Sequence, residues 1–523
     1  MKLEKYDFLF WVTIVLVFFF AFWIRVTDLE KNPPGFFCDE AATGYNAYKI
    51  LMTGKDEYGK SYPLLFQSFG DFKSPVFIYS AVLPVAIFGV SEVSIRFTSV
   101  VYGMLGILGT FLFARELFSN RWIGLFSALI LAITPWHVHL SRVGFDVNLQ
   151  SFFVPAMLWS FLRYVKTKSF VSFIVFCLLA VLGFWSYVAA RISISVVILL
   201  SLCAYPHFLK NVLLKKKSVI LTIVVMCVMM GFVYITMKNG SFMGRYKQLT
   251  AGESREMLDY PRAYMKYFSP DFLFLKGDAL MPDQNISRHS IIGFGELHHY
   301  QLICIAWAIF GIFYLKKYRK MGLFLLALIA SYPIAGVVAS NVPSATRVAH
   351  ASALFAVLSG FGMYAMFSIR IRGYRYIGAV CGICVGIFLL VNTSGYLRAS
   401  KEYESLAYGH EGWQYGFRDS MAKLNAQRLN YDDLIITHRF NAAEILLAFY
   451  NVNKLCLNCV IMHNPINIEP DRKQLFSLRS SDIDEAKSLY PDYSFVQIDS
   501  IRPPGVAIDE LKMGYFTQEK KFK

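Results

Sequence analysis

Long apolar runs alternate with short polar segments along most of the chain. A helix needs roughly 20 apolar residues to cross a hydrocarbon core about 30 Å thick. Eleven runs approach or reach that length, and they cover residues 8–27, 92–117, 122–137, 148–165, 169–187, 190–209, 218–237, 300–315, 321–340, 349–368 and 375–395. The pattern therefore predicts an all-α polytopic membrane protein with about eleven transmembrane helices.

A twelfth apolar run, residues 76–90, differs from these eleven. It is only about fifteen residues long and contains Pro84. A segment of this length is short for a span but long enough to lie in the plane of the interface. We expect an interfacial helix there.

The charge distribution sets the orientation. The chain has 52 Lys and Arg against 36 Asp and Glu, a net charge of +16, and such an excess can indicate nucleic-acid binding. If the N-terminus is cytoplasmic and 76–90 does not cross, six cytoplasmic pieces hold 18 Lys and Arg and only three acids: 1–7, 115–121, 163–168, 206–218, 315–320 and 369–375. Because this obeys the positive-inside rule in every loop, we expect a plasma-membrane protein with a cytoplasmic N-terminus and no nucleic-acid partner.

Three long segments then share the outer side of the membrane. They are the first outer loop (28–91), a second long loop (238–299) and the C-terminal part (397–523). The C-terminal part has 16 Lys and Arg and 17 Asp and Glu, as expected for a domain in water. We therefore divide the chain into a transmembrane domain, 1–396, and an extracytoplasmic domain, 397–523.

Strand-like and helix-like segments alternate in 397–523, which predicts a small α/β domain. We expect strands near 432–438, 455–462 and 494–499, and helices near 411–428 and 441–451. Cys456 and Cys459 form a CxxC pair in this domain. Structural zinc needs four ligands and no second pair stands nearby, so the pair is a local disulfide or two free thiols.

Acidic residues stand at the outer ends of two spans. Asp39 and Glu40 follow the first span, and adjacent carboxylates repel, so that one tends to need a cationic partner. Asp146 begins the span after a short outer loop, where a buried carboxylate is costly. Each acid could equally stabilise a helix N-terminus. Chemically, these three acids are candidates for a general base or for metal ligands.

Basic residues stand at the same level. Lys73 precedes the run 76–90, Arg142 lies in the loop before Asp146, and Arg347 begins the tenth span. An arginine fork can bind two phosphate oxygens, although interfacial anchoring explains such residues equally well. His137 and His139 could bind a metal ion. No nucleotide-binding, zinc or nucleophile-elbow motif is present, so acids and cations at headgroup level favour a lipid-phosphate substrate.

With these residues the chain resembles the GT-C superfamily of integral-membrane glycosyltransferases. It is most similar to a bacterial branch related to protein O-mannosyltransferases and lipid A aminoarabinose transferases. The resemblance extends to about residue 350, in FFCDEAATGYNAYKILMTGKDEYGKSYP, FGDFKSP, SIRFTSVVYGMLGILG, ITPWHVHLSRVGFDVN, WSYVAARIS, YFSPDFLFLKGD, RHSIIGFGELHHY and NVPSATRVAH. Relatives often have Glu-Lys-Pro-Pro where this chain has Asp71-Phe72-Lys73-Ser74-Pro75, so the acid stands one position further from the lysine.

The resemblance implies transfer of a hexose or pentose from a polyprenyl-phosphate donor to a lipid, glycan or protein acceptor. Asp39 matches the catalytic carboxylate of the family, Lys73 the lysine near the donor phosphate, and Asp146 the acid of the second outer loop. Arg347 and Arg142 would assist at the phosphate, and Glu40 would support Asp39 or bind a metal ion. We expect no obligatory metal or other cofactor, with a divalent cation left open.

Two other functions remain as alternatives. An oligosaccharyltransferase acting from a lipid diphosphate is expected to have a second acid beside Asp146, which this loop lacks. A flippase for lipid-linked sugars is expected to have ionisable residues and broken helices near the middle of the bilayer. The sequence does not identify the sugar, the acceptor, the oligomeric state or the role of the C-terminal domain.

Overall fold

The fold is described from a computed structural model. It describes residues 2–240, 259–278, 288–339, 341–369, 377–402, 412–502 and 511–518. The chain forms two compact units. The first, the helical unit, comprises Met1–Thr27, Leu64–Phe77 and Phe97–Ala399; the second, the sheet unit, comprises Asp28–Pro63, Ile78–Arg96 and Ser400–Lys523.

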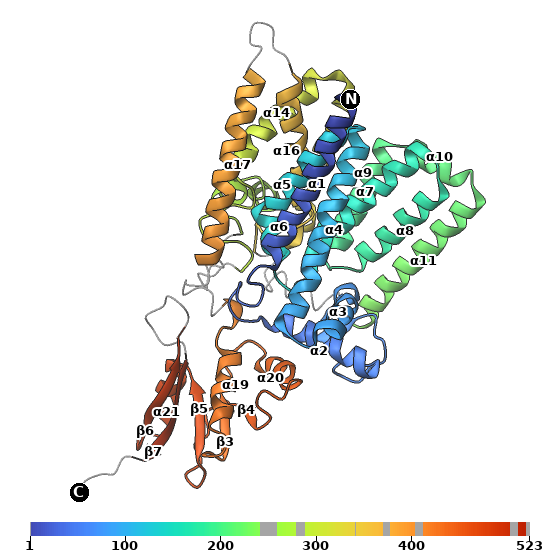
Figure 1. Ribbon diagram of the computed structural model, residues 1–523. Coiled ribbons are helices and arrows are strands. Elements are labelled where there is room, and N and C mark those ends of the chain that lie inside the picture. The colour runs from blue at the N-terminus through green and yellow to red at the C-terminus, as the bar shows by residue number, and fades with distance from the viewer. Residues whose placement is uncertain are drawn as a thin grey trace. The chain divides into compact units, whose positions relative to one another are not determined.

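Every one of the eleven predicted apolar segments contains a helix (Figure 1). In chain order these are α1 (Lys2–Val26), α4 (Glu92–Phe118), α5 (Arg121–Ile133), α7 (Gln150–Thr167), α8 (Phe170–Phe184), α9 (Ala190–Ala204), α11 (Lys216–Lys238), α14 (Tyr300–Tyr314), α15 (Arg319–Ser331), α16 (Ala351–Ser368) and α17 (Ile377–Glu402). The prediction of an all-α membrane part is confirmed.

The number of complete spans is a separate matter. Within the described ranges, five helices are long and apolar enough to cross a membrane, and up to seven spans result if two bent pairs count as one span each. The pairs are α9 with α10 (His207–Leu213), bent by 95°, and α14 with Lys316–Ala335, bent by 98°. Because α5 has only 13 residues and Pro135 opens the short helix α6 (Pro135–Leu140) directly after it, the predicted run 122–137 is interrupted. The count of eleven spans is not confirmed.

Small residues allow close packing in the core of the helical unit. Helix α16 is buried along almost its whole length between α5 and α14. A side chain added at Gly362 would lie 1.8 Å from the carbonyl oxygen of Cys304, and one at Gly360 would lie 2.4 Å from the Ser127 hydroxyl. Small residues at these points let the backbones approach, as is common between membrane helices.

A short hairpin carries Lys73 in the helical unit. Strand β1 (Phe66–Ser68) pairs antiparallel with β2 (Asp71–Lys73). Both residues of the turn, Phe69 and Gly70, have positive φ angles of 50° and 75°, as the two-residue turns of hairpins require. The run 76–90 begins just after it and forms helix α3 (Pro75–Phe88), so the helix expected there is confirmed.

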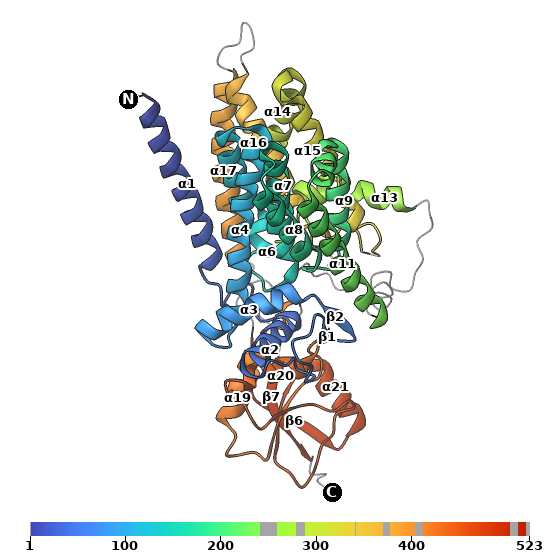
Figure 2. The same ribbon diagram turned by 90° about the vertical axis from the view of Figure 1, so that its right-hand side faces the viewer.

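The sheet unit contains a mixed five-stranded sheet in the order β4-β3-β5-β7-β6; its strands are labelled in Figure 1, and Figure 2 gives the view turned by 90°. Strand β3 (Asp433–Ile436) is parallel to β4 (Cys459–Ile461) and β5 (Gln474–Leu478), whereas β7 (Leu511–Gln518) is antiparallel to β5 and β6 (Tyr493–Ile501). Helices α19 (Phe417–Ala426), α20 (Ala443–Asn451) and α21 (Ser480–Leu489) accompany it. This confirms a small C-terminal α/β region. Sequence reasoning missed β5, α21 and β7.

Part of the first outer loop packs within the sheet unit. Helix α2 (Cys38–Thr53) lies against α20, with the ring of Phe36 4.8 Å from that of Phe449. The Cys38 backbone N–H donates to the Gln414 side chain at 2.6 Å. The compact unit thus includes 28–63 and 78–96, which a boundary drawn from hydropathy at 396 assigns to the membrane domain. Cys456 and Cys459 form a disulfide, which decides between the two alternatives for this pair.

Candidate functional site

The two acids at the start of α2 have different surroundings. Both lie in the first turn of the helix, where negative charge is favourable. Glu40 is completely buried; its carboxylate accepts the Phe37 N–H at 3.1 Å and lies 3.1 Å from Nε of Arg96. Asp39 is only half-buried, since successive helical residues point about 100° apart. The contacts give Glu40 a positioning role and leave Asp39 as the more accessible acid of the pair.

Arg96, which sequence reasoning missed, organises the backbone before α2. It is completely buried. Besides Glu40, its guanidinium donates at 2.5–3.3 Å to four backbone carbonyls, those of Leu29, Glu30, Pro33 and Gly35. One side chain therefore fixes the segment that leads to Asp39. The available signal was an arginine within an apolar segment, where an ionisable residue needs a partner.

Further buried polar contacts surround this ion pair in the sheet unit. The Tyr450 hydroxyl donates to Glu92 at 2.6 Å, and Arg418 lies 3.4 Å from Glu92 and 2.7 Å from Glu30. Burial raises the pKa of Tyr450 well above its ordinary value, and the charge of Glu92 raises it further, so Tyr450 remains a hydrogen-bond donor at neutral pH. These contacts connect the start of α4 to α19 and α20.

Lys73 and Arg142, both predicted at the donor phosphate, lie in the helical unit. Lys73 ends β2 and is half-buried, with its ammonium 5.3 Å from the centre of the Phe69 ring. Arg142 is buried, and its guanidinium donates to the carbonyls of Ile24 and Arg25 in the last turn of α1, at 2.6 and 3.2 Å, and to that of Thr27 just after the helix, at 2.9 Å. Because a cation there satisfies carbonyls that the helix leaves unpaired, these contacts favour a helix-capping role for Arg142.

The two histidines of the second outer loop contact different neighbours. Nδ1 of His137 lies 2.9 Å from the Arg25 guanidinium, and Nε2 of His139 lies 2.7 Å from the carbonyl oxygen of Arg288. Burial lowers the pKa of His139 to about 4, so it is neutral at pH 7. No group of three His, Cys, Asp or Glu that could hold a metal ion occurs in the described parts of the chain.

Asp146 and Arg347 lie on two turns that pack against each other. Asp146 begins the 3₁₀ turn η1 (Asp146–Leu149), and Arg347 lies in η5 (Thr346–Val348), about 200 residues later. Gln150 joins the two segments: its amide donates to the Thr346 carbonyl at 3.5 Å, and its oxygen lies 3.2 Å from Nδ1 of His350. The structure thus brings together an acid and an arginine that the sequence analysis selected separately.

Arg347 itself is half-exposed. One of its terminal nitrogens donates to the Asn341 carbonyl at 2.8 Å, which orients the guanidinium and leaves other N–H groups for a ligand. Phosphate binding by Arg347 stays a prediction, with which this contact is compatible.

Three further residues, which sequence reasoning missed, adjoin these turns. One oxygen of Asp278 is 2.9 Å from Nδ1 of His289 and accepts the backbone N–H of Ala345 at 3.0 Å. The Asp278 N–H donates to Glu296 at 2.9 Å. Burial raises the pKa of Glu296 well above its ordinary value, and the charge of Asp278 adds to this shift. The sequence did offer a signal for Asp278 and His289. They lie in GD (277–278) and RHS (288–290), which belong to the stretches that resemble the GT-C superfamily, but no site residue was selected from them.

The predicted site residues are thus divided between the two units. Asp146, Arg347, Lys73 and Arg142 belong to the helical unit, and Asp39 and Glu40 belong to the sheet unit. Within the helical unit, the turns that carry Asp146 and Arg347 pack against each other.

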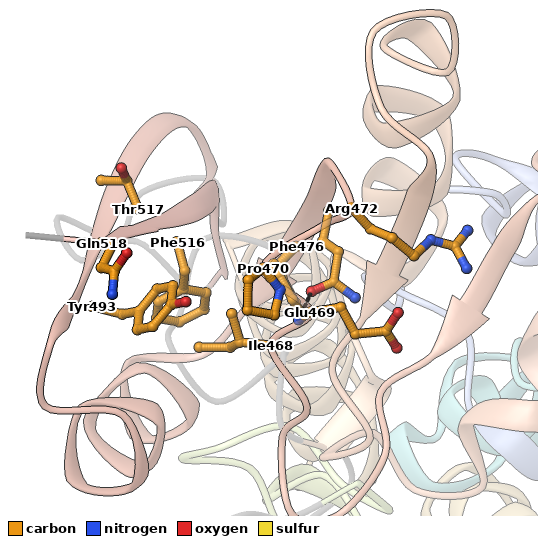
Figure 3. Close-up of a pocket in the computed structure, with 10 residues that line it drawn as sticks. Ile468, Glu469, Pro470, Arg472, Phe476, Tyr493, Phe516, Thr517 and Gln518 are labelled. Atoms are coloured by element: carbon orange, nitrogen blue, oxygen red, sulfur yellow. Dashed lines mark hydrogen bonds between the residues drawn. The ribbon is translucent and has the colours of Figure 1, made fainter.

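A cavity of about 200 Å³ lies elsewhere, in the sheet unit (Figure 3). Tyr493 and Phe516 line one side and Arg472 the other, with Ile468 and Pro470 between them. Arg472 already pairs with Asp433 at 2.6 Å, and Asn467 donates to Glu469 at 3.0 Å. Because its charged residues are engaged with neighbours, we do not assign group transfer to this cavity.

Comparison with known proteins shows a family match over part of the chain and a similarity of fold over most of it. The dolichyl-phosphate-mannose-protein mannosyltransferase family matches residues 72–235, which is less than half of the chain. No curated protein matches the sequence.

Solved structures match over most of the chain. ArnT from Cupriavidus metallidurans bound to undecaprenyl phosphate is 11% identical, with a TM-score of 0.58, and the match covers 96% of this chain and 97% of that one. The apo state gives a TM-score of 0.55 at 11% identity and 98% coverage of both chains. The archaeal oligosaccharyltransferase AglB from Archaeoglobus fulgidus, in complex with an inhibitory peptide and a dolichol-phosphate, gives 0.54 at 12% identity, covering 94% of this chain and 69% of that one.

Proposed function

We propose that this chain, a multi-pass membrane protein of the GT-C glycosyltransferase superfamily, transfers a sugar from a polyprenyl-phosphate donor to an acceptor hydroxyl. The observation that carries the proposal is the packing of the Asp146 turn against the Arg347 turn, because it joins an acid and a phosphate-binding cation at the ends of membrane helices. The family match over 72–235 and the undecaprenyl phosphate bound by ArnT support the same donor class.

The chemistry follows from the residue types. The acceptor oxygen attacks the anomeric carbon while Asp39 takes the hydroxyl proton. The bond from that carbon to the phosphate oxygen breaks, and its electron pair leaves with the lipid phosphate. Lys73 and Arg347 stabilise the charge that grows there, and Asp146 orients the acceptor. Because the displacement is direct, the anomeric configuration inverts.

The finer assignments belong to the same proposal. The sugar is a hexose or a pentose, and the acceptor is a lipid, a glycan or a protein. The reaction takes place on the outer face of the plasma membrane, since the basic loops predict a cytoplasmic N-terminus and an outer C-terminal region. No metal is obligatory, and full activity in a chelator would support this. Glu40 acts by holding the start of α2, and Arg142 by capping α1.

The test is an assay of polyprenyl phosphate release. Purified full-length protein is given a panel of radiolabelled polyprenyl-phosphate sugars, and wild type is compared with Asp39→Asn. We expect a loss of about 10²–10⁴-fold, the usual contribution of a general base. Asp471→Asn, the same change at an exposed site in the C-terminal region, should retain full activity.

Other outcomes would redirect the proposal. Turnover that survives Asp39→Asn would move the base elsewhere, with Asp146 the first candidate. Transfer from a lipid diphosphate to an asparagine peptide would favour the oligosaccharyltransferase alternative. The fold similarity to the archaeal oligosaccharyltransferase is consistent with that alternative. No turnover, with scrambling of lipid-linked sugars in liposomes, would refute the transferase and favour a flippase.

A further inference from the structure

Asp278 and His289 form a hydrogen-bonded pair in the helical unit that the proposed mechanism does not use. The Asp278 carboxylate is almost fully buried and accepts from both Nδ1 of His289 and the backbone of Ala345. A carboxylate that accepts from one ring nitrogen fixes the tautomer and the orientation of an imidazole. Nε2 is therefore the nitrogen of His289 that could contact a ligand. Among the described residues, none hydrogen-bonds to it.

The pair is connected to both turns that carry predicted site residues. Through Ala345 it holds the loop in which Arg347 stands two residues later. The ring of Phe145, the residue before Asp146, lies edge-on to the His289 ring with centroids 6.5 Å apart. The His289 side chain is 21% exposed, against 9% for Asp278, so the imidazole is accessible whereas the carboxylate that holds it is not.

The local charges favour an anionic ligand. Burial lowers the pKa of His139 to about 4, so His139 is neutral at pH 7. Burial also raises the pKa of Glu296 well above its ordinary value, which disfavours its negative charge. The negative charge of Asp278 is already shared by two donors. The N–H groups of Arg347 and Nε2 of His289 are among the groups that are at least partly exposed here. An imidazolium that donates Nδ1–H to Asp278 still has Nε2–H to donate.

We propose that His289 is a further hydrogen-bond donor of the donor-phosphate subsite, in addition to Lys73 and Arg347, and that Asp278 is its positioning residue. The proposal rests on the proposed function for the identity of the lipid phosphate. The Nε2–H of His289 donates to a phosphate oxygen, and Asp278 holds the ring and the Arg347 loop in one arrangement. A charge-assisted hydrogen bond of this kind is stronger than a neutral one, and its strength increases as the phosphate gains charge during departure.

The test measures binding of polyprenyl phosphate to the full-length protein in detergent, together with steady-state kinetics. His289→Asn keeps an N–H donor near Asp278 but removes Nε2. We expect about tenfold weaker binding and a similar rise in donor KM, with acceptor KM unchanged. Asp278→Asn should weaken binding several-fold through loss of orientation, and His289→Gln, which returns an amide near the Nε2 position, should recover part of the affinity. His463→Asn, at an exposed site, is the matched control.

The outcomes separate this inference from the proposed function. If wild type binds and transfers and His289→Asn and His289→Gln both match it, the inference is refuted and the function stands. If kcat falls while donor KM is unchanged, His289 acts on the acceptor and the phosphate role is refuted. If wild type neither binds polyprenyl phosphate nor transfers sugar, the proposed function fails first. Competition by inorganic phosphate as strong as by polyprenyl phosphate would identify a general phosphate site in place of a lipid-phosphate site.

Discussion

The carboxylate of Glu40 and the guanidinium of Arg96 form an ion pair at 3.1 Å, and both side chains are completely shielded from solvent. Arg96 also binds the carbonyls of the segment before α2. The pair therefore determines where α2 begins, and with it the direction of the neighbouring Asp39. The sequence analysis grouped Glu40 with the proposed catalytic residues, whereas its contacts suit a supporting role beside Asp39.

Glu40→Gln tests this support. Removing one partner of a buried ion pair leaves an uncompensated charge, which typically costs about 3–5 kcal/mol. We expect a loss of stability of that size in denaturant or thermal unfolding of the purified protein, accompanied by loss of transfer. Glu30→Gln is the matched control, because Glu30 pairs with Arg418 near the surface and exposed pairs are worth roughly 0–1 kcal/mol. Equal effects of the two variants would contradict the assignment.

Arg142 and Arg347 should behave oppositely. Arg142→Ala removes the hydrogen bonds that cap α1, so we expect it to lower unfolding stability by about 1–3 kcal/mol while donor KM stays the same. Arg347→Ala should raise donor KM about tenfold with little change in stability, because only one carbonyl contact is lost. A rise in donor KM for a stable Arg142→Ala protein would restore the predicted phosphate role of Arg142.

Helix packing makes Gly362 intolerant of a side chain. A Cβ there would lie 1.8 Å from the Cys304 carbonyl oxygen, so Gly362→Ala must force α14 and α16 apart, and we expect a cost of about 1–3 kcal/mol or more. Gly386→Ala in α17 meets nothing within 4 Å and should be neutral or stabilising by up to roughly 1 kcal/mol. Comparing the thermal unfolding of the two variants distinguishes a packing clash at Gly362 from a general intolerance of substitution in these helices.

Glu296 makes stability depend on pH. Its pKa is raised in the folded protein by burial and by Asp278, so the folded state keeps a proton that the unfolded state releases above about pH 4.5. Stability from this group is complete below that pH and is lost as pH rises toward the folded pKa. Glu296→Gln keeps the oxygen that accepts the Asp278 N–H but cannot titrate. We expect the unfolding temperature of wild type to fall relative to the variant from pH 5 to pH 8; parallel curves would show that Glu296 is ionised when folded.

Much of the helical architecture follows from local pattern. Each apolar run contains a helix because in lipid the backbone must satisfy its own hydrogen bonds, which an apolar segment does only as a helix. Hydropathy did not show the hairpin turn at Phe69 and Gly70, because that turn depends on a few dihedral angles. It also did not show the bends after α9 and α14, because these depend on neighbouring helices. The strands β5 and β7 escaped detection for a related reason, since their pattern is decided by pairing partners distant in sequence.

The sequence alone determined which residue types stand at the ends of the apolar segments, because partition between lipid and water is read along a single segment. It identified Asp39, Asp146, Lys73 and Arg347 in this way. Only the tertiary structure showed which residues form the contacts around them. Glu40 pairs with Arg96, Arg142 binds carbonyls at the end of α1, and Asp278 binds His289 and Ala345. These partners lie up to about 120 residues apart, and a hydrogen bond or ion pair forms only where packing brings two such segments within about 3 Å.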